Sequence, residues 1–218
     1  MDRLELIASL SKGSHTLLDV GCDHAYVLIK ALTKYQVQQG IASDINDGPL
    51  KVAKQNVIKN HLEDRIQIVK SDGLKDVNIS FDTVIISGMG GNLIRDILDN
   101  SKEKIKGKKL ILGPNNDQRL VRAFLMQQEF LIIDEYSIID MGKYYEIIVA
   151  IPGLIKYEDY ELEFGPILLK KKEPAFLSHY KEKEELLTKV IQRVSSDTIL
   201  LDKKRELELI QKYIVKKD

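Results

Sequence analysis

The chain has 218 residues, and its 33 lysines and arginines are balanced by 33 aspartates and glutamates, so the formal net charge is zero. This length suffices for one core domain and an appendage but not for two full domains. No apolar run approaches the roughly 20 residues of a membrane span, and residues 1–10 lack the apolar core of a signal peptide. Cys22 is the single cysteine, which excludes an internal disulfide and a multi-cysteine zinc site. We therefore expect a cytoplasmic protein with no membrane partner.

Strand and helix patterns alternate over residues 1–151. Short β-branched or apolar runs predict strands at Thr16–Val20, Gly40–Ser43, Ile66–Val69, Thr83–Ile86 and Leu110–Leu112. Helical periodicity lies between most of them, at Tyr26–Tyr35, Leu50–Ile58, Leu93–Leu98 and Leu120–Gln127. Asp47-Gly48-Pro49 predicts a helix start. This alternation indicates βαβ units and a mainly parallel sheet with helices on both faces.

The pattern changes after the fifth strand. Two apolar runs, Phe130–Ile139 and Tyr144–Ile151, are joined by Asp140-Met141-Gly142-Lys143, which predicts a β-hairpin. Five parallel strands followed by an antiparallel pair differ from the six-stranded dinucleotide-binding form. They fit an α/β fold, the Rossmann-like seven-stranded sheet of class I methyltransferases.

Helical spacing returns from Pro174 onward. The apolar positions of this region, on either side of Ser195-Ser196-Asp197, are Phe176, Tyr180, Leu187, Ile191, Val194, Leu200, Leu207, Ile210 and Ile214. They predict two helices in an antiparallel, coiled-coil-like hairpin. Leu154–Gly165 would be the linker, so we expect a domain over residues 1–153 and a linker with the helical hairpin over residues 154–218.

Basic residues are unevenly distributed. Residues 163–218 carry 13 lysines and arginines against 10 acidic residues. Basic clusters occur at Lys170–Lys172, Lys203–Arg205 and Lys102–Lys109. Such clusters can contact a phosphate backbone, and they are equally compatible with solvated faces.

The first predicted strand ends in a glycine turn, Asp19-Val20-Gly21-Cys22-Asp23, ahead of a helix. Nucleotide-like ligands bind at such turns. A dinucleotide requires G-x-G-x-x-G, but Asp23 stands where the second glycine would be, and a carboxylate repels a diphosphate by roughly 1 kcal/mol even in water. S-adenosylmethionine lacks phosphate and carries a sulfonium and an ammonium, which Asp19 and Asp23 would attract. The turn therefore favours S-adenosylmethionine over NAD.

Later strand ends supply further candidate cofactor ligands. Asp44 lies 23 positions after Gly21 and matches the acidic residue that accepts hydrogen bonds from ribose hydroxyls; the alternative is a helix cap or an exposed turn acid. In the pair Asp72-Gly73, the acid can accept a hydrogen bond from the adenine amino group and the glycine lets the ring lie close. The alternative is a common Asp-Gly turn. Gly88-Met89-Gly90-Gly91 allows backbone to approach a ligand closely, with Met89 against the adenine; the alternative is a flexible loop.

The fifth strand ends in Pro114-Asn115-Asn116, and Asn suits pairing with an adenine edge. The fourth strand lacks the acid or Asn followed by two prolines that is frequent in enzymes acting on exocyclic amines. A ring nitrogen such as adenine N1 needs positioning more than activation. His24 is as compatible with capping or packing as with catalysis, and Tyr26 is expected to face the core. The remaining histidines show no ligand spacing, so we expect no metal.

Together these motifs resemble the TrmK family of bacterial tRNA (adenine-N1)-methyltransferases, which act on position 22 in the D-arm. The resemblance is carried by Asp19–Tyr26, Asp47–Pro49, Asp72–Leu74, Gly88–Gly91 with Leu93–Arg95, Pro114-Asn115, Tyr145–Ile147 and Phe164–Pro166. It implies a tRNA substrate, S-adenosylmethionine as donor and no metal, and no obligate protein partner is evident.

The motifs, taken with this resemblance, lead to expected roles for individual residues. Asn115 and His24 are the expected catalytic residues. The expected cofactor-binding residues are Asp19, Gly21, Asp23, His24, Asp44, Asp72, Gly73, Gly88, Met89 and Gly90. Two alternatives stay open, an NAD(P)-dependent oxidoreductase on the same fold and a non-catalytic RNA or protein adaptor.

Overall fold

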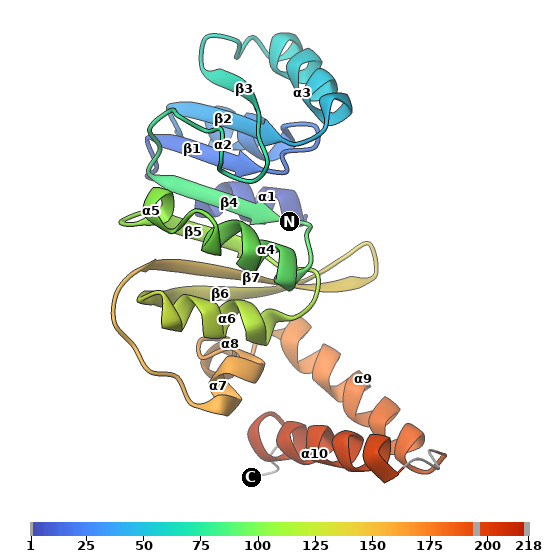
Figure 1. Ribbon diagram of the computed structural model, residues 1–218. Coiled ribbons are helices and arrows are strands. Elements are labelled where there is room, and N and C mark those ends of the chain that lie inside the picture. Colours follow the sequence, from blue (N-terminus) through green and yellow to red (C-terminus); the bar gives the residue numbers. More distant parts are fainter. Residues whose placement is uncertain (1, 194–196, 216–218) are drawn as a thin grey trace.

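The computed structural model describes residues 2–193 and 197–215 and has a seven-stranded sheet at its centre (Figure 1). The strands are β1 Thr16–Val20, β2 Gln39–Asp44, β3 Ile66–Lys70, β4 Thr83–Ser87, β5 Lys109–Gly113, β6 Phe130–Asp140 and β7 Lys143–Pro152. Their order is β3-β2-β1-β4-β5-β7-β6; β1 to β5 are parallel, and β7 is antiparallel to both of its neighbours. The predicted Rossmann-like sheet is confirmed.

Helices cover both faces of this sheet. On one face lie α1 Arg3–Leu10, α2 Tyr26–Lys34 and α3 Asp47–Lys59, and on the other α4 Gly91–Asp99, α5 Lys102–Ile105 and α6 Gln118–Gln127. Leu17 and Leu18, adjacent on β1, belong to the two opposite cores, because successive strand side chains point to opposite faces. All five residues of β1 are buried, as expected for a strand covered on both sides.

The β6–β7 hairpin extends beyond the rest of the sheet. Leu112 of β5 pairs with Ile148 of β7, so residues 143–146 of β7 lie past the carboxyl end of β5. In Figure 1 the hairpin tip projects beyond the edge at which the parallel strands end. The hairpin therefore stands beside whatever binds at that edge.

Four helices follow β7: α7 Asp159–Phe164, α8 Leu168–Lys171, α9 Pro174–Ile191 and α10 Asp197–Tyr213. The second half of the expected linker, Leu154–Gly165, forms α7. A capping box between Glu158 and Glu161 starts this helix. Ser195, Ser196 and Val194 lie outside the described residues. No helix that the structure describes is long and apolar enough to cross a membrane.

The C-terminal helices share one core. Its buried members are Phe164, Leu168, Phe176, Tyr180, Leu187, Ile210 and Ile214. These include five of the apolar positions predicted from helical spacing. Tyr160 of α7 and Tyr213 of α10 stack with ring centroids 4.2 Å apart, so α10 folds back beneath α7 (Figure 1). The two predicted long helices are confirmed, while coiled-coil geometry stays a prediction.

A buried ion cluster joins the sheet to these helices. The guanidinium of Arg122 on α6 is fully buried and pairs with Glu135 of β6 at 2.7 Å and with Glu146 of β7. It also donates to two carbonyls at the end of α7, and Glu135 accepts from two backbone N–H groups at the start of α8. Gly165 lies between these helices with φ +89°, and a Cβ there would lie 2.7–2.9 Å from atoms of Glu135 and Arg122. The cluster fixes the C-terminal helices against the sheet.

Candidate functional site

A pocket of about 370 Å³ lies at the carboxyl ends of β1, β2 and β4. The strand order reverses between β1 and β4, and open α/β sheets bind ligands at such a switch point. The pocket is lined by Arg3, Leu4, Asp19, Gly21, Cys22, Asp23, His24, Tyr26, Val27, Asp44, Ser87, Gly88 and Met89. Seven of the ten predicted cofactor residues are therefore brought together in one pocket.

The turn after β1 shapes the floor of this pocket. The N–H groups of Gly21 and Cys22 both donate to the carbonyl of Ser43 on β2, at 2.8 and 3.0 Å. Gly21 has φ +70°, and a Cβ there would overlap the methyl group of Met89. Another residue would be strained at this φ and would displace the end of the Met89 side chain, so glycine suits the turn.

Three carboxylates, those of Asp19, Asp23 and Asp44, face the pocket. Asp19 is 4% exposed, and burial, followed by repulsion from Asp44 and Asp23, raises its pKa to about 7. Arg3 is the only lysine or arginine among the described lining residues, and its Nε is buried without a hydrogen-bond partner. A ligand that carries positive charge would relieve the repulsion among these carboxylates.

Asp44 makes the turn contact that was one of the two expectations from the sequence, and it also lines the pocket. Its Oδ1 accepts a hydrogen bond of 2.9 Å from the N–H of Asn46, the residue that precedes α3. Its Oδ2 makes no hydrogen bond to the described residues. One oxygen therefore holds the turn, and the other is available to a ligand hydroxyl.

His24 and Tyr26 both line the pocket. His24 Nε2 is 3.5 Å from Asp23 Oδ1, its ring meets the Tyr26 ring edge-to-face, and its Nδ1 is buried without a partner among the described residues. The prediction that Tyr26 faces the core was wrong, since its side chain is 47% exposed. The buried residues of α2 are Val27, Leu28, Ala31 and Leu32, and helical spacing places Tyr26 on the opposite side of the helix.

The loops after β4 and β5 are joined by hydrogen bonds. The Asn115 N–H donates to the Met89 carbonyl at 2.8 Å, and its side-chain Nδ2 donates to the Gly88 carbonyl at 2.7 Å. Asn116 Oδ1 accepts from the N–H of Gly91 at 3.1 Å. Asn116 therefore supports the start of α4, whereas Asn115 Oδ1 has no partner among the described residues.

Three predicted cofactor residues do not line the pocket. Asp72 and Gly73 follow β3 next to Asp44, and a Cβ at Gly73 would lie 3.1 Å from Ile97. A Cβ at Gly90 would lie 3.0 Å from Asn116 Oδ1. Both glycines are therefore sites where a loop packs closely against a neighbouring side chain. The cofactor-binding roles of all three residues stay predictions.

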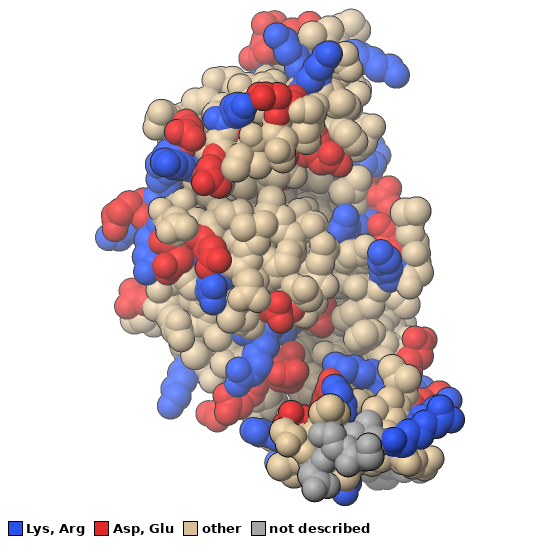
Figure 2. Space-filling model, turned by 45° about the vertical axis from the view of Figure 1, so that its right-hand side comes forward, with Lys and Arg blue, Asp and Glu red and all other residues tan. Residues whose placement is uncertain are grey.

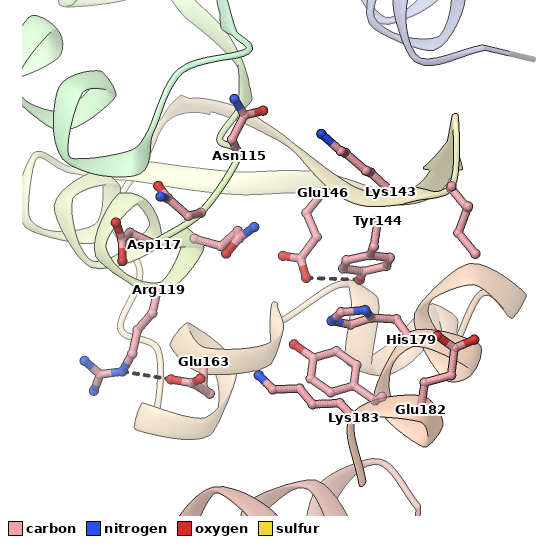
Figure 3. A pocket seen from close by; sticks show the side chains of 15 residues that line it. Asn115, Asp117, Arg119, Lys143, Tyr144, Glu146, Glu163, His179, Glu182 and Lys183 are labelled. Carbon is pink, nitrogen blue, oxygen red and sulfur yellow. Dashed lines mark hydrogen bonds and ion pairs between the residues drawn. The ribbon is translucent and has the colours of Figure 1, made fainter. Parts of the chain in front are cut away.

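A second cavity of about 780 Å³ begins at Asn115 and extends between the β6–β7 hairpin and α9 (Figure 3). The Tyr144 hydroxyl donates to Glu146 at 3.0 Å, and the Tyr144 ring stacks on His179 at 3.9 Å. Lys143 reaches over the cavity from the hairpin, and Lys183 lies on the α9 side. Sequence reasoning missed this cavity because its walls come from segments far apart in the chain.

The predicted basic clusters differ in their surroundings. Lys104 donates to three backbone carbonyls and Lys109 to the carbonyl of Leu10, near the amino end of β5 and away from the pocket. These two lysines stabilise the fold. Elsewhere basic and acidic side chains are interspersed over the visible face, including the C-terminal helices (Figure 2). Within the described residues, no three His, Cys, Asp or Glu side chains are grouped so as to hold a metal ion.

The family model TrmK, described as tRNA (adenine(22)-N(1))-methyltransferase, matches residues 17–217. The chain belongs to the TrmK family. The tRNA (adenine(22)-N(1))-methyltransferase of Bacillus subtilis is 32% identical over 214 residues, which cover 94% of this chain and 90% of that protein.

Solved structures agree with this membership of the TrmK family. Streptococcus pneumoniae Sp1610 in complex with S-adenosyl-L-methionine matches with a TM-score of 0.88 and 33% identity, over 98% of this chain and 100% of that chain. M. capricolum TrmK in complex with S-adenosyl-homocysteine matches with a TM-score of 0.88 and 28% identity, over 98% and 96%. The alternatives of an oxidoreductase and of an adaptor find no support among these relatives.

Proposed function

We propose that this chain transfers a methyl group from S-adenosylmethionine to N1 of the adenine at position 22 of tRNA, in the cytoplasm. The observation that carries the proposal is the acidic pocket at the strand ends of a TrmK-family fold. Its three carboxylates, with a single arginine among the described lining residues, fit a cofactor that carries a sulfonium and an ammonium. They oppose a diphosphate, which would bring more negative charge next to Asp19, Asp23 and Asp44.

Within this pocket we assign the cofactor contacts as follows. Asp19 and Asp23 attract the positive groups, and the free Oδ2 of Asp44 accepts from a ribose hydroxyl. Met89 and the exposed backbone of Gly88 form an apolar wall for the adenine ring. When bound, the cofactor supplies an electrophilic methyl group.

Asn115 is assigned to hold the target adenine. Its Nδ2 is committed to the Gly88 carbonyl, so its side chain is fixed with Oδ1 as a free acceptor. An adenine amino group donating to Oδ1 would place the neighbouring N1 at the mouth of the cofactor pocket. N1 carries a lone pair and no proton, so the transfer requires alignment rather than a general base. The positive charge that develops on the adenine ring stays close to the carboxylates of the pocket.

We further propose that the two predicted domains bind different ligands. Residues 1–153 would bind the cofactor, and residues 154–218 would bind tRNA through lysines of α9 and α10. Four basic side chains of these helices form no salt bridge with the residues that the structure describes: Lys181, Lys189, Lys204 and Arg205. Neutralising phosphates through these cations would make tRNA affinity fall steeply with salt.

Methyl transfer to defined tRNA tests the catalytic proposal. The protein is incubated with labelled S-adenosylmethionine and a tRNA transcript that has adenine at position 22, and the nucleosides are separated by mass spectrometry. We expect 1-methyladenosine as the product, and none from a matched transcript with guanine at position 22. Label in another nucleoside, or equal label in both transcripts, would contradict the proposal.

Charge substitutions test tRNA binding by the terminal helices. Truncation after Gly153 is unsuitable because it would uncover the Arg122 cluster. Replacing Lys181, Lys189 and Lys204 by Gln should weaken tRNA binding at least tenfold and reduce its salt dependence, with cofactor affinity unchanged. Lys106→Gln, near the amino end of β5, is the control. Wild-type tRNA affinity in the triple variant would remove the assigned role of these helices.

A further inference from the structure

The tip of the β6–β7 hairpin consists of two residues, Met141 and Gly142. Asp140 and Lys143 form the last pair of the ladder, and Met141 and Gly142 have φ +48° and +75°. Positive φ at both central residues is the mark of a type I′ turn, for which Asn-Gly is the favoured sequence. Methionine at the first position places a side chain in a conformation that costs about 1 kcal/mol or more for an L-residue other than Asn or Asp.

Met141 is also the most exposed large hydrophobic side chain among the described residues, at 96% exposure. Its neighbour Ile139 is 51% exposed on the same hairpin. Neither the turn nor the core accounts for a methionine here, because Asn would suit the backbone better and a polar residue would suit the solvent. Strained and exposed apolar residues of this kind cluster at functional sites.

The position of the tip connects it with the assigned substrate site. From Ile147, next to the end of β5, six residues of extended chain place the tip about 20 Å beyond the edge of the sheet. Ile139, Gly142 and Lys143 line the cavity that begins at Asn115, and Figure 1 shows the tip overhanging that edge. Lys143 is exposed and makes no ion pair within the described ranges.

We infer that Met141 is a wedge that enters the base stack of the RNA when the target adenine leaves it. This inference rests on the proposed function, because N1 lies on the pairing edge of adenine and a folded RNA hides it. Enzymes that modify a base in a folded RNA must first extrude it, at a cost of a few kcal/mol. Apolar side chains, methionine among them, enter base steps of nucleic acids and offset the lost stacking. Lys143, two residues away, would then contact the flanking phosphate.

RNA is favoured over other partners by the size and place of the tip. A stable protein interface needs about 800 Å² from each partner, far more than one methionine and a neighbouring isoleucine provide. Lys143, two residues from Met141, carries the positive charge that suits contact with a phosphate backbone. The tip also lies beside the loop that is assigned to hold the target base.

Met141→Asn is a sharp test because it improves the turn while removing the wedge. We expect an unchanged or higher melting temperature and unchanged affinity for S-adenosylmethionine. Methylation of tRNA should fall at least tenfold, and the fluorescence rise of a tRNA with 2-aminopurine at position 22 should be lost. Met141→Leu, which keeps apolar bulk, should retain most of both signals.

A tRNA that lacks the base opposite position 22 provides the deciding control. Because its adenine is already loosened, it should restore methylation by Met141→Asn to within about threefold of the wild-type rate. Two results would overturn the inference. One is fluorescence and methylation by Met141→Asn at the wild-type level; the other is a methylation defect of Met141→Asn that is as large on the loosened tRNA as on the intact tRNA. Failure of the wild-type protein to methylate position 22 would instead refute the proposed function.

Discussion

The pKa of Asp19 makes cofactor binding depend on pH. With burial, Asp44 and Asp23 raising this pKa to about 7, the carboxyl group is about half protonated at neutral pH in the free protein. A cationic cofactor binds the carboxylate and not the acid, so binding would lower the pKa and expel the proton. S-adenosylmethionine affinity should therefore rise as the pH increases through 7, and Asp19→Asn should abolish this part of the dependence.

The magnitude follows from the ionised fraction. With a pKa of about 7, roughly one-tenth of Asp19 is ionised at pH 6 and roughly nine-tenths at pH 8. The dissociation constant should therefore fall about tenfold between these pH values, which corresponds to about 1.4 kcal/mol. At pH 7, binding should release about half a proton.

Isothermal titration calorimetry in buffers of different ionisation enthalpy measures both quantities. Asp47→Asn, which removes an exposed carboxylate that pairs with Lys70, serves as the charge-matched control and should keep the pH dependence. Equal pH dependence in the wild type and in Asp19→Asn, or no difference in proton release at pH 7, would refute the reasoning.

The same group affects the stability of the cofactor-free protein. Its pKa is raised above the unfolded value of about 3.9, so the stabilisation from protonated Asp19 is present below about pH 4 and is lost as the pH rises to about 7. The loss amounts to at most about 4 kcal/mol in the free energy of unfolding, and Asp19→Asn should remove it. Urea unfolding at pH 5 and pH 8 would measure the difference.

Three further substitutions test the pocket and the ion cluster. Asp44→Ala should weaken S-adenosylmethionine binding at least tenfold in calorimetry, because hydrogen bonds to a charged group contribute about 1.5–3 kcal/mol, and an unchanged affinity would remove the ribose assignment. Gly165→Ala should lose about 1–3 kcal/mol more in urea unfolding than Gly13→Ala, since both have φ +89° but a Cβ at Gly13 meets nothing within 4 Å. Arg122→Met should lower the free energy of unfolding by about 3–5 kcal/mol, because two buried carboxylates lose their counter-ion; a loss below 1 kcal/mol would contradict the structural role of the cluster.

The sheet and much of the pocket could be predicted because they depend on short-range patterns. Buried parallel strands are continuous apolar runs, so Thr16–Val20 was bounded correctly and the other strands to within one or two residues of the structure. The carboxyl ends of parallel strands meet at one edge, so Asp19 and Asp44 could be expected to lie in the same pocket. Their positions at the ends of two successive predicted strands were enough to predict this.

Other features depend on tertiary contacts that no local pattern encodes. Arg3 reaches the pocket because α1 packs beside α2. The sequence of α1 contains no pattern that predicts this packing. The Tyr144–His179 stack requires the hairpin and α9 to be positioned by the buried Arg122 cluster. The exposure of Met141 was equally hidden, since an Asp-Met-Gly-Lys turn predicts only a hairpin.

The central claim is that carboxylates at adjacent strand ends select a sulfonium cofactor and reject a diphosphate. Crystals soaked with equal concentrations of S-adenosylmethionine and NAD test it most directly. We predict S-adenosylmethionine in the pocket, with its cationic groups next to Asp19 and Asp23 and its ribose on Asp44. NAD in that pocket, with its diphosphate against the turn at Gly21, would contradict the account.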